Sequence, residues 1–182
     1  MNALKIKTFY FNPYRECTYV VWHEGEQECL LVDAGMSNER EWERLRMFLT
    51  EEKLVPIALL ITHTHPDHVC GTDFVEQAYG VNATVYPAEG TLTAGGFRIE
   101  VIRTPGHKED CVCYYLRDEN VLFTGDTLFQ ESVGRTDLPG GDMQTLVLSL
   151  RKLVTLPEET NVYPGHGYPT TIGHEKQYNP YL

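Results

Sequence analysis

Several features that would assign this chain of 182 residues to a specialised class are missing from its sequence. No apolar run approaches the length of a membrane span, and the first residues lack the apolar core of a signal peptide. Basic residues are in the minority, with 15 Lys and Arg against 26 Asp and Glu, for a net charge of −11. We therefore expect a cytoplasmic protein with no membrane partner and no nucleic-acid partner, because no basic stripe is available for phosphates.

The sequence also gives no indication that its cysteines form disulfides or a zinc site. The five cysteines are odd in number, and no two of them have C-x-x-C spacing, so neither a disulfide framework nor a zinc ribbon is indicated. Cys111 and Cys113 fall in a predicted strand, where burial as small apolar side chains is favoured over redox or ligand roles.

Strand patterns occur in two batches, each followed by helical patterns, and this order predicts an α+β fold. The first batch gives strands at 5–11, 17–22, 27–32 and 57–61, with helices at 38–51 and 73–79. The second gives strands at 83–86, 97–103, 111–116, 121–124 and 162–164, with a helix at 143–154. We predict a single domain over residues 1–182 with two sheets packed face to face between helices, a four-layer αββα sandwich.

Histidines cluster directly after the buried strand at 57–61. His63, His65 and His68 lie within six residues, with Asp67 between them. A polar turn containing Pro66 is one reading of this stretch. Three imidazoles and a carboxylate this close together favour the other reading, a metal site, because a bound cation removes their mutual repulsion.

Three later strands end in a similar way. His107 and His166 each follow a predicted strand and a glycine, and Asp126 follows the strand at 121–124 and Gly125. Each alone is a weak indication of ligation, but loops of this design at strand ends can converge on one edge of a sandwich. His23 and His174 lack this setting, and we expect both on the surface.

The ordered His-x-His-x-Asp-His run followed by His107, Asp126 and His166 resembles the metallo-β-lactamase-fold hydrolases over nearly the whole chain. The segments at 123–129 and 170–180 resemble the glyoxalase II-like branch, the hydroxyacylglutathione hydrolases. The chain ends soon after His166 and lacks the helical extension of full-length glyoxalase II, so the short, single-domain members are the better match.

This resemblance implies two divalent metal ions, with zinc favoured and iron or manganese as alternatives. His63, His65 and His107 would hold one ion, Asp67, His68 and His166 the other, and Asp126 would bridge them. A hydroxide shared by two ions about 3.5–4 Å apart would attack a small-molecule thioester such as an acyl-glutathione. Asp67 and His68, as ligands of the second ion, are the residues to which catalysis is assigned.

Arg135 and Lys108 are the predicted substrate-binding residues. Arg135 aligns with a position that meets a glutathione carboxylate in the relatives, although a structural pairing with Asp137 or Asp142 is an equal alternative. Lys108 follows a predicted ligand, and a surface role is its alternative. Asp33, after a strand and before Gly35, is expected to orient a metal ligand or to serve as an ordinary turn residue.

The Gly-Arg-Thr-Asp element at 134–137 also resembles persulfide dioxygenases of the same fold. Those relatives hold one iron with two histidines and one aspartate, here His63, His107 and Asp126. A mononuclear-iron dioxygenase is therefore the alternative function, while the acidic composition disfavours the nuclease branch.

Overall fold

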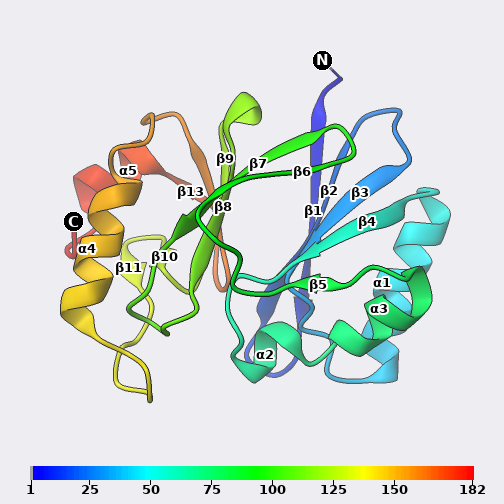
Figure 1. Ribbon diagram of the computed structural model, residues 1–182, viewed down its shortest axis with the longest axis horizontal. Helices are drawn as coiled ribbons and strands as arrows, with labels where there is room; N and C mark the ends of the chain where they lie inside the picture. The colour runs from blue at the N-terminus through cyan, green and yellow to red at the C-terminus, as the bar shows by residue number, and fades with distance from the viewer. Residues whose placement is uncertain (1) are drawn as a thin grey trace. The chain divides into compact units, whose positions relative to one another are not determined.

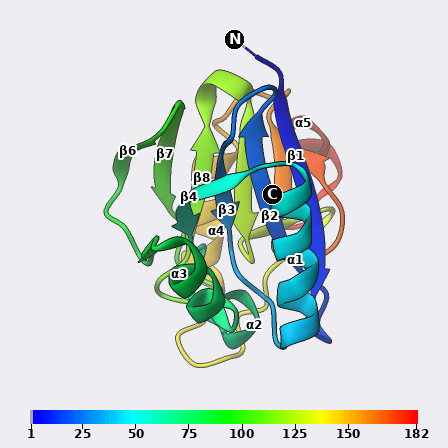
Figure 2. The same cartoon turned by 90° about the vertical axis from the view of Figure 1, so that its right-hand side faces the viewer.

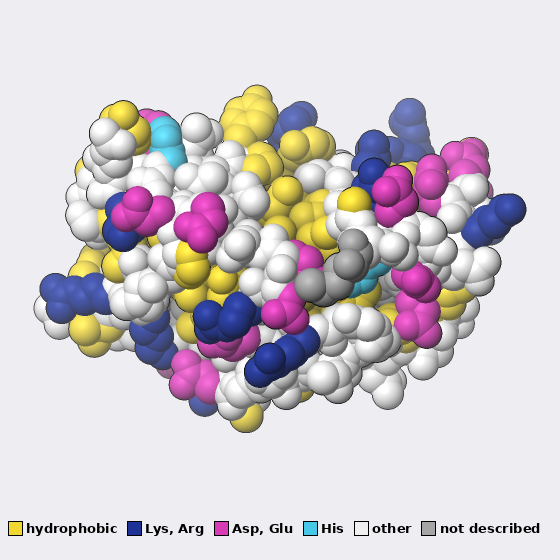
Figure 3. All heavy atoms as spheres, turned by 90° about the horizontal axis from the view of Figure 1, so that it is seen from above, with side chains coloured by type: hydrophobic (Ala, Val, Ile, Leu, Met, Phe, Trp, Pro, Cys, Tyr) yellow, Lys and Arg dark blue, Asp and Glu magenta, His cyan; other side chains and the backbone are white. Residues whose placement is uncertain are grey.

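The computed structural model describes residues 2–182, and contacts within the chain divide it into two compact units. Unit 1 ends at Val85 and unit 2 comprises Tyr86–Leu182. Within the described residues, no helix is long and apolar enough to cross a bilayer. On the face of the surface shown in Figure 3, acidic and basic side chains are interspersed.

Unit 1 is built on a five-stranded sheet whose strands are hydrogen-bonded in sequence order. The strands are β1 (Leu4–Phe11), β2 (Glu16–His23), β3 (Glu28–Val32), β4 (Val55–Leu60) and β5 (Ala83–Thr84). The first three form an antiparallel meander, whereas β3–β4 and β4–β5 are parallel pairs. Three helices accompany them: α1 (Glu39–Glu51), α2 (Pro66–Val69) and α3 (Thr72–Tyr79).

The apolar face of α1 explains how unit 1 is held together. Trp42, Leu45 and Leu49 recur at helical spacing and are buried against Phe9, Leu31 and other residues of the sheet. Figures 1 and 2 show α1 lying along the sheet. Asn38 caps this helix, since its side chain accepts a hydrogen bond from the Glu41 N–H at 3.1 Å.

Unit 2 contains a six-stranded sheet with the order β13-β12-β9-β8-β7-β6 and a small hairpin, β10–β11. The bounds are β6 (Gly90–Ala94), β7 (Phe97–Arg103), β8 (Val112–Leu116), β9 (Val121–Gly125), β10 (Leu128–Phe129), β11 (Ser132–Val133), β12 (Asn161–Pro164) and β13 (Thr170–Thr171). The turn between β8 and β9 is the 3-10 helix η1 (Arg117–Glu119). Its helices are α4 (Met143–Leu153) and α5 (Ile172–Tyr178).

Helix α4 packs on the larger sheet of unit 2 through Leu146, Leu150 and Leu153, which are buried with Leu122 and Val162. Ile172 of α5 joins the same core. Figure 1 shows α4 and α5 on one side of this sheet. The sequence analysis assigns no strand or helix to 90–94, 128–133 or 170–178, where the structure has β6, the β10–β11 hairpin, β13 and α5.

Candidate metal centre

In unit 1 the histidine loop starts where β4 ends. Strands β3 and β4 are parallel neighbours, so their carboxyl ends meet at the same edge of the sheet. Main-chain hydrogen bonds tie the two following segments together: Ala34 N donates to His68 O at 2.8 Å, and Gly71 N donates to Ala34 O at 2.7 Å. This pairing fixes the backbone of the loop relative to the segment after Asp33.

The orientation of His68 is set by Asp33. His68 Nδ1 lies 2.8 Å from Asp33 Oδ2, and both residues are buried. The carboxylate also accepts from the Thr62 N–H at 2.7 Å and the Thr62 hydroxyl at 2.8 Å. With the proton on Nδ1, the lone pair of Nε2 is directed toward Asp67, whose Oδ2 is 3.8 Å away.

Asp33 is also a strained residue. Its φ of 59° places a non-glycine residue in the left-handed region, which costs of the order of 1–3 kcal/mol. Four hydrogen bonds hold it there, because its own N–H donates to Leu60 O at 2.9 Å in addition to the three bonds its side chain accepts. The backbone is thus strained at Asp33, where the carboxylate faces His68.

His63 and His65 present ring nitrogens to one another. His63 Nε2 and His65 Nδ1 are 3.1 Å apart, and the two rings are nearly perpendicular at 83°. The His63 ring also lies 4.1 Å from that of His68. One of these nitrogens can donate to the other when it is protonated, and without that proton a cation can bind both, so this geometry suits a metal.

Glu16 is a site residue that the sequence analysis missed. Its carboxyl group is completely buried, and ligand atoms of Glu16, Asp33 and His68 all lie within 4.8 Å of one another. The Thr18 hydroxyl donates to Glu16 Oε2 at 2.9 Å and accepts from Gly35 N at 3.0 Å. Burial raises the pKa of Glu16, while the neighbouring His68 lowers it. A carboxylate in an otherwise apolar strand was the available signal.

Asn12 is a second missed residue. Its side-chain amide donates to Gly35 O at 3.0 Å and to Asp67 O at 2.9 Å, which joins the predicted ligand loop to the segment after β3. Glu41 of α1 accepts from the Asn12 N–H at 2.9 Å. Glu41, in the first turn of α1, therefore holds the Asn12 backbone whose side chain contacts Asp67.

In unit 2, His107, Asp126 and His166 follow β7, β9 and β12. These three strands run in the same direction, since β7 and β9 are each antiparallel to β8 and β12 is parallel to β9. The following residues therefore lie at one edge. Asp126 Oδ2 is 3.5 Å from His107 Nε2 and 3.6 Å from His166 Nε2.

Those separations are too long for hydrogen bonds but match the spacing of atoms that share an ion. Two ligand atoms each about 2.1 Å from a tetrahedral metal lie about 3.4 Å apart. Because Asp126 Oδ2 has this relation to both imidazoles, its position fits a bridging carboxylate.

His107 has its tautomer fixed by the main chain. Its Nδ1 lies 2.7 Å from the carbonyl oxygen of Arg135, which can only accept, so Nδ1 bears the proton and the Nε2 lone pair is directed toward Asp126. Gly134 packs so closely that a Cβ at this position would collide with Asp126 O and approach His107 Cβ at 3.1 Å.

The two predicted substrate-binding residues both pair with neighbouring carboxylates. Arg135 forms two hydrogen bonds of 2.7 Å with Asp137, and both side chains are more than half exposed. Lys108 Nζ lies 2.9 Å from Asp110 Oδ2. Lys108 lines a cavity of about 440 Å³ with Glu109, Asp110, Pro139 and Gly140.

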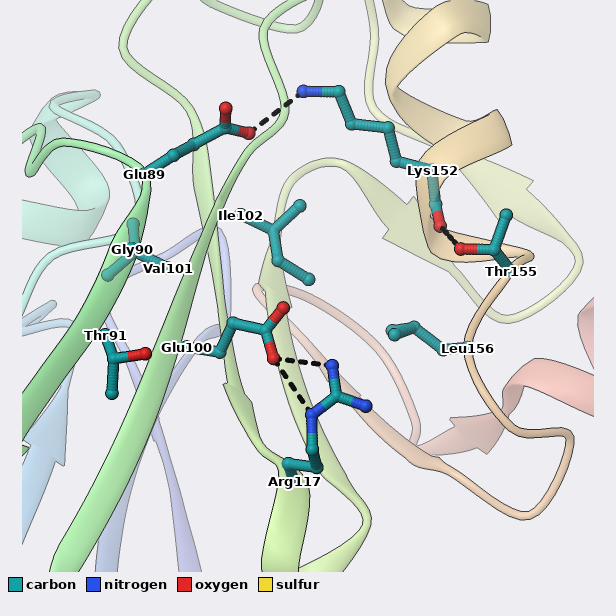
Figure 4. A pocket seen from close by; sticks show the side chains of 10 residues that line it. All are labelled: Glu89, Gly90, Thr91, Glu100, Val101, Ile102, Arg117, Lys152, Thr155 and Leu156. Carbon is teal, nitrogen blue, oxygen red and sulfur yellow. Dashed lines mark hydrogen bonds and ion pairs between the residues drawn. The ribbon is translucent and has the colours of Figure 1, made fainter.

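A second cavity of unit 2, of about 400 Å³, lies between the β6–β7 hairpin and the end of α4. Figure 4 shows its charged side chains directed toward one another: Lys152 is 3.0 Å from Glu89 and Arg117 is 2.6 Å from Glu100. Each of these charges therefore has an opposite partner, as Lys108 does in the other cavity.

The residues of each unit fit divalent metal ions. Imidazole nitrogens and carboxylate oxygens are the donors that zinc, iron and manganese accept. For His68 and His107 a hydrogen bond at Nδ1 leaves Nε2 as the ligand atom. The donor set does not select one of these metals.

Comparison with known proteins relates the chain to a family. A model of the family described as "Metallo-beta-lactamase superfamily" matches residues 15–95 and 88–166. The chain is 34% identical to the probable metallo-hydrolase YqgX of Bacillus subtilis, over 87% of this chain and 89% of that protein. It is 30% identical to the hydroxyacylglutathione hydrolase GloC of Haemophilus influenzae, over 98% of each.

Solved structures are similar over the same extent. BLEG-1, titled a B3 metallo-beta-lactamase, has a TM-score of 0.92 at 34% identity, covering 98% of this chain and 99% of its own. ETHE1 from Myxococcus xanthus has a TM-score of 0.87 at 28% identity, covering 97% and 83%. TTHA1623 in a di-iron-bound form has a TM-score of 0.82 at 32% identity, covering 97% and 100%. The predicted fold, two sheets with helices, is confirmed.

Proposed function

Since the chain belongs to the metallo-β-lactamase superfamily and is a metallo-hydrolase by that membership, we propose that it hydrolyses a thioester, in particular an acyl-glutathione or similar acyl-thiol. The observation that carries this proposal is the donor arrangement in each unit, in which buried histidines have their Nδ1 atoms occupied and their Nε2 atoms next to a carboxylate. The likeness to GloC, a hydroxyacylglutathione hydrolase, supports the substrate class.

The proposed ligands are those that the resemblance predicts. His63, His65 and His107 serve one divalent ion, Asp67, His68 and His166 serve a second, and Asp126 serves both. Zinc is the first choice for both ions. Bound metals in such sites lower the pKa of water toward neutrality and stabilise a developing oxyanion.

The chain's own residues supply positioning. Asp33 and the Arg135 carbonyl hold His68 and His107 in the tautomers that ligation requires. Asn12 fixes the backbone at Asp67. No strong general acid is required, because a thiol has a pKa near 8.5 and leaves readily as a thiolate.

Lys108 and Arg135 are the proposed contacts for the anionic part of the substrate. Lys108 already pairs with Asp110, and Arg135 already pairs with Asp137. A substrate carboxylate would therefore compete with these aspartates for the two cationic side chains. The Arg135–Asp137 pair is exposed and exchanges partners readily, since surface ion pairs contribute little.

The decisive experiment combines metal analysis with activity assays. Protein purified without added metal is analysed for zinc, iron and manganese, and tested on an acyl-glutathione, on glutathione persulfide with oxygen, and on a β-lactam. We expect two ions per chain and thioester turnover. One iron per chain with oxygen consumption and no thioester cleavage would favour the dioxygenase, and β-lactam cleavage alone would redirect the substrate class toward that named for BLEG-1.

His68→Ala tests the second metal position. A dinuclear hydrolase should lose activity and bind one ion fewer, because His68 is a ligand of the second ion. A mononuclear iron enzyme using His63, His107 and Asp126 should retain most of its turnover. The metal content of the variant, measured alongside its activity, separates the two.

A further inference from the structure

The C-terminal helix α5 contains a completely buried carboxylate, Glu175, that no role in the proposed reaction explains. Its Oε1 accepts from the Thr170 hydroxyl at 2.6 Å. Its Oε2 accepts from the Glu131 N–H at 2.8 Å and from the Asn179 side-chain amide at 2.8 Å. Every contact is a donor, so the group is built to accept hydrogen bonds.

Glu175 and Asn179 each make one hydrogen bond to the main chain of the β10–β11 hairpin. Glu131 N donates to Glu175, and Asn179 uses its second amide hydrogen to donate to Ser132 O at 3.0 Å. Asn179 is itself 5% exposed. Glu131 has a φ of 56°, a conformation that needs such support outside glycine. Helix α5 therefore holds the main chain of this hairpin at Glu131 and Ser132.

The segment 128–135, made of this hairpin and the two residues after it, contacts all three predicted ligands of unit 2. Phe129, in β10, packs edge-on to the His166 ring with 6.2 Å between ring centroids. Gly134, directly after β11, lies against Asp126 O and His107 Cβ. The next carbonyl, that of Arg135, accepts the His107 Nδ1 proton at 2.7 Å.

We propose that Glu175 and Asn179 are positioning residues that fix His107 through the segment 128–135. This inference rests on the proposed function, in that His107 matters as a metal ligand. The segment 170–180 resembles the glyoxalase II-like branch, but its residues have no part in the proposed reaction. The inference gives two of them, Glu175 and Asn179, a role. The effect has to pass along only a short stretch of chain, since Ser132, which Asn179 holds, is three residues before Arg135, whose carbonyl orients His107.

The substitution Glu175→Leu tests the proposal by replacing the acceptor with an apolar side chain of similar size. The readout is the His107 Nδ1 proton, observed by ¹H–¹⁵N NMR of the metal-free protein and assigned with His107→Gln. We expect its resonance to shift and its exchange with solvent to accelerate, while circular dichroism stays as in the wild type. We also expect zinc affinity to fall by about 10- to 100-fold.

Glu175→Gln is the rescue variant. Its amide oxygen can accept from Glu131 N and Asn179, and the Thr170 hydroxyl can rotate to accept from the amide nitrogen. The His107 resonance should then resemble the wild type. Glu158→Leu is the matched control, because Glu158 is an exposed carboxylate paired with Lys176 of the same helix at 2.7 Å.

A folded Glu175→Leu protein with an unchanged His107 resonance overturns the proposal. If that variant does not fold, Asn179→Ala decides by the same measurement, since it leaves Thr170 and Glu131 bonded to Glu175. The NMR readout uses neither metal nor substrate. Failure of the wild type to bind metal or cleave thioesters would therefore count against the proposed function and not against this inference.

Discussion

Asp33 and the Arg135 carbonyl act in the same way on different histidines, since each accepts an Nδ1 proton and leaves Nε2 for a metal. They differ in charge. A carboxylate makes its imidazole a better metal ligand than a neutral carbonyl does, so His68 should bind a metal ion more strongly than His107. Both acceptors are held in place, Asp33 by hydrogen bonds from Thr62 and Arg135 by the close packing of the preceding Gly134.

Cysteine reactivity gives a prediction at the residue scale. Cys70 is exposed, whereas Cys17, Cys29, Cys111 and Cys113 are buried and all five are free thiols. Burial raises the pKa of Cys29 and of Cys113 to about 12, which suppresses their thiolates. A disulfide reagent at pH 8 should modify one thiol per native chain and all five after denaturation; rapid modification of more than one would contradict the burial of the rest.

Gly134→Ala should destabilise the protein, because an added Cβ would collide with the Asp126 carbonyl, which is main chain and cannot rotate away. Overpacking of this kind typically costs about 1–3 kcal/mol. Denaturant unfolding measures the loss. Gly96→Ala is the control, as nothing lies within 4 Å of a Cβ there, and equal stability of the two variants would argue against the close packing.

At the scale of elements, the strongly periodic segments were predictable, whereas three of the two-residue strands were not. Helix α1 shows a buried face of Trp42, Leu45 and Leu49 that its spacing predicts. Strands β10, β11 and β13 have two residues each, too few for any alternation to be recognised. Helix α5 buries Ile172 and Glu175 in one turn, and a carboxylate on the buried side hides the apolar pattern.

The N-cap of α1 provides a prediction for an element. Asn38→Ala removes the acceptor for the Glu41 N–H and should lower the free energy of unfolding by about 1 kcal/mol. Asn38→Asp keeps an acceptor in the same place and should unfold as the wild type does. Thermal or denaturant unfolding compares the three proteins, and a loss shared by both variants would rule out capping as the cause.

For the whole molecule, the relevant fact is that predicted ligands occur in both compact units, four in unit 1 and three in unit 2. On the proposed ligand assignment, metal binding would stabilise the folded protein. A group that binds only the folded state stabilises it by mass action.

Metal removal tests this stabilisation. Saturation with zinc at 100 times its dissociation constant should add about 2.7 kcal/mol to the free energy of unfolding, and a chelator should remove that gain. The midpoint of unfolding is measured with and without chelator. His107→Gln should respond less, since it lacks one ligand, and a wild-type midpoint that ignores both zinc and chelator would contradict the proposal.

The sequence by itself determined the family, the strand-end positions of the seven predicted ligands, and most of the two batches of strands, because each follows from local pattern and order along the chain. The strand predicted at 83–86 was placed in the wrong batch, since β5 pairs with β4 in the first sheet. It did not reveal the hydrogen-bonding roles of Glu16, Asn12, Glu175 and Asn179. Some of their partners are distant in sequence, such as Asp67 for Asn12 and Ser132 for Asn179. Only the tertiary structure showed that buried polar groups hold the ligands in place. The reason is physical: the need for a buried hydrogen-bond partner arises only once folding has removed water from both groups.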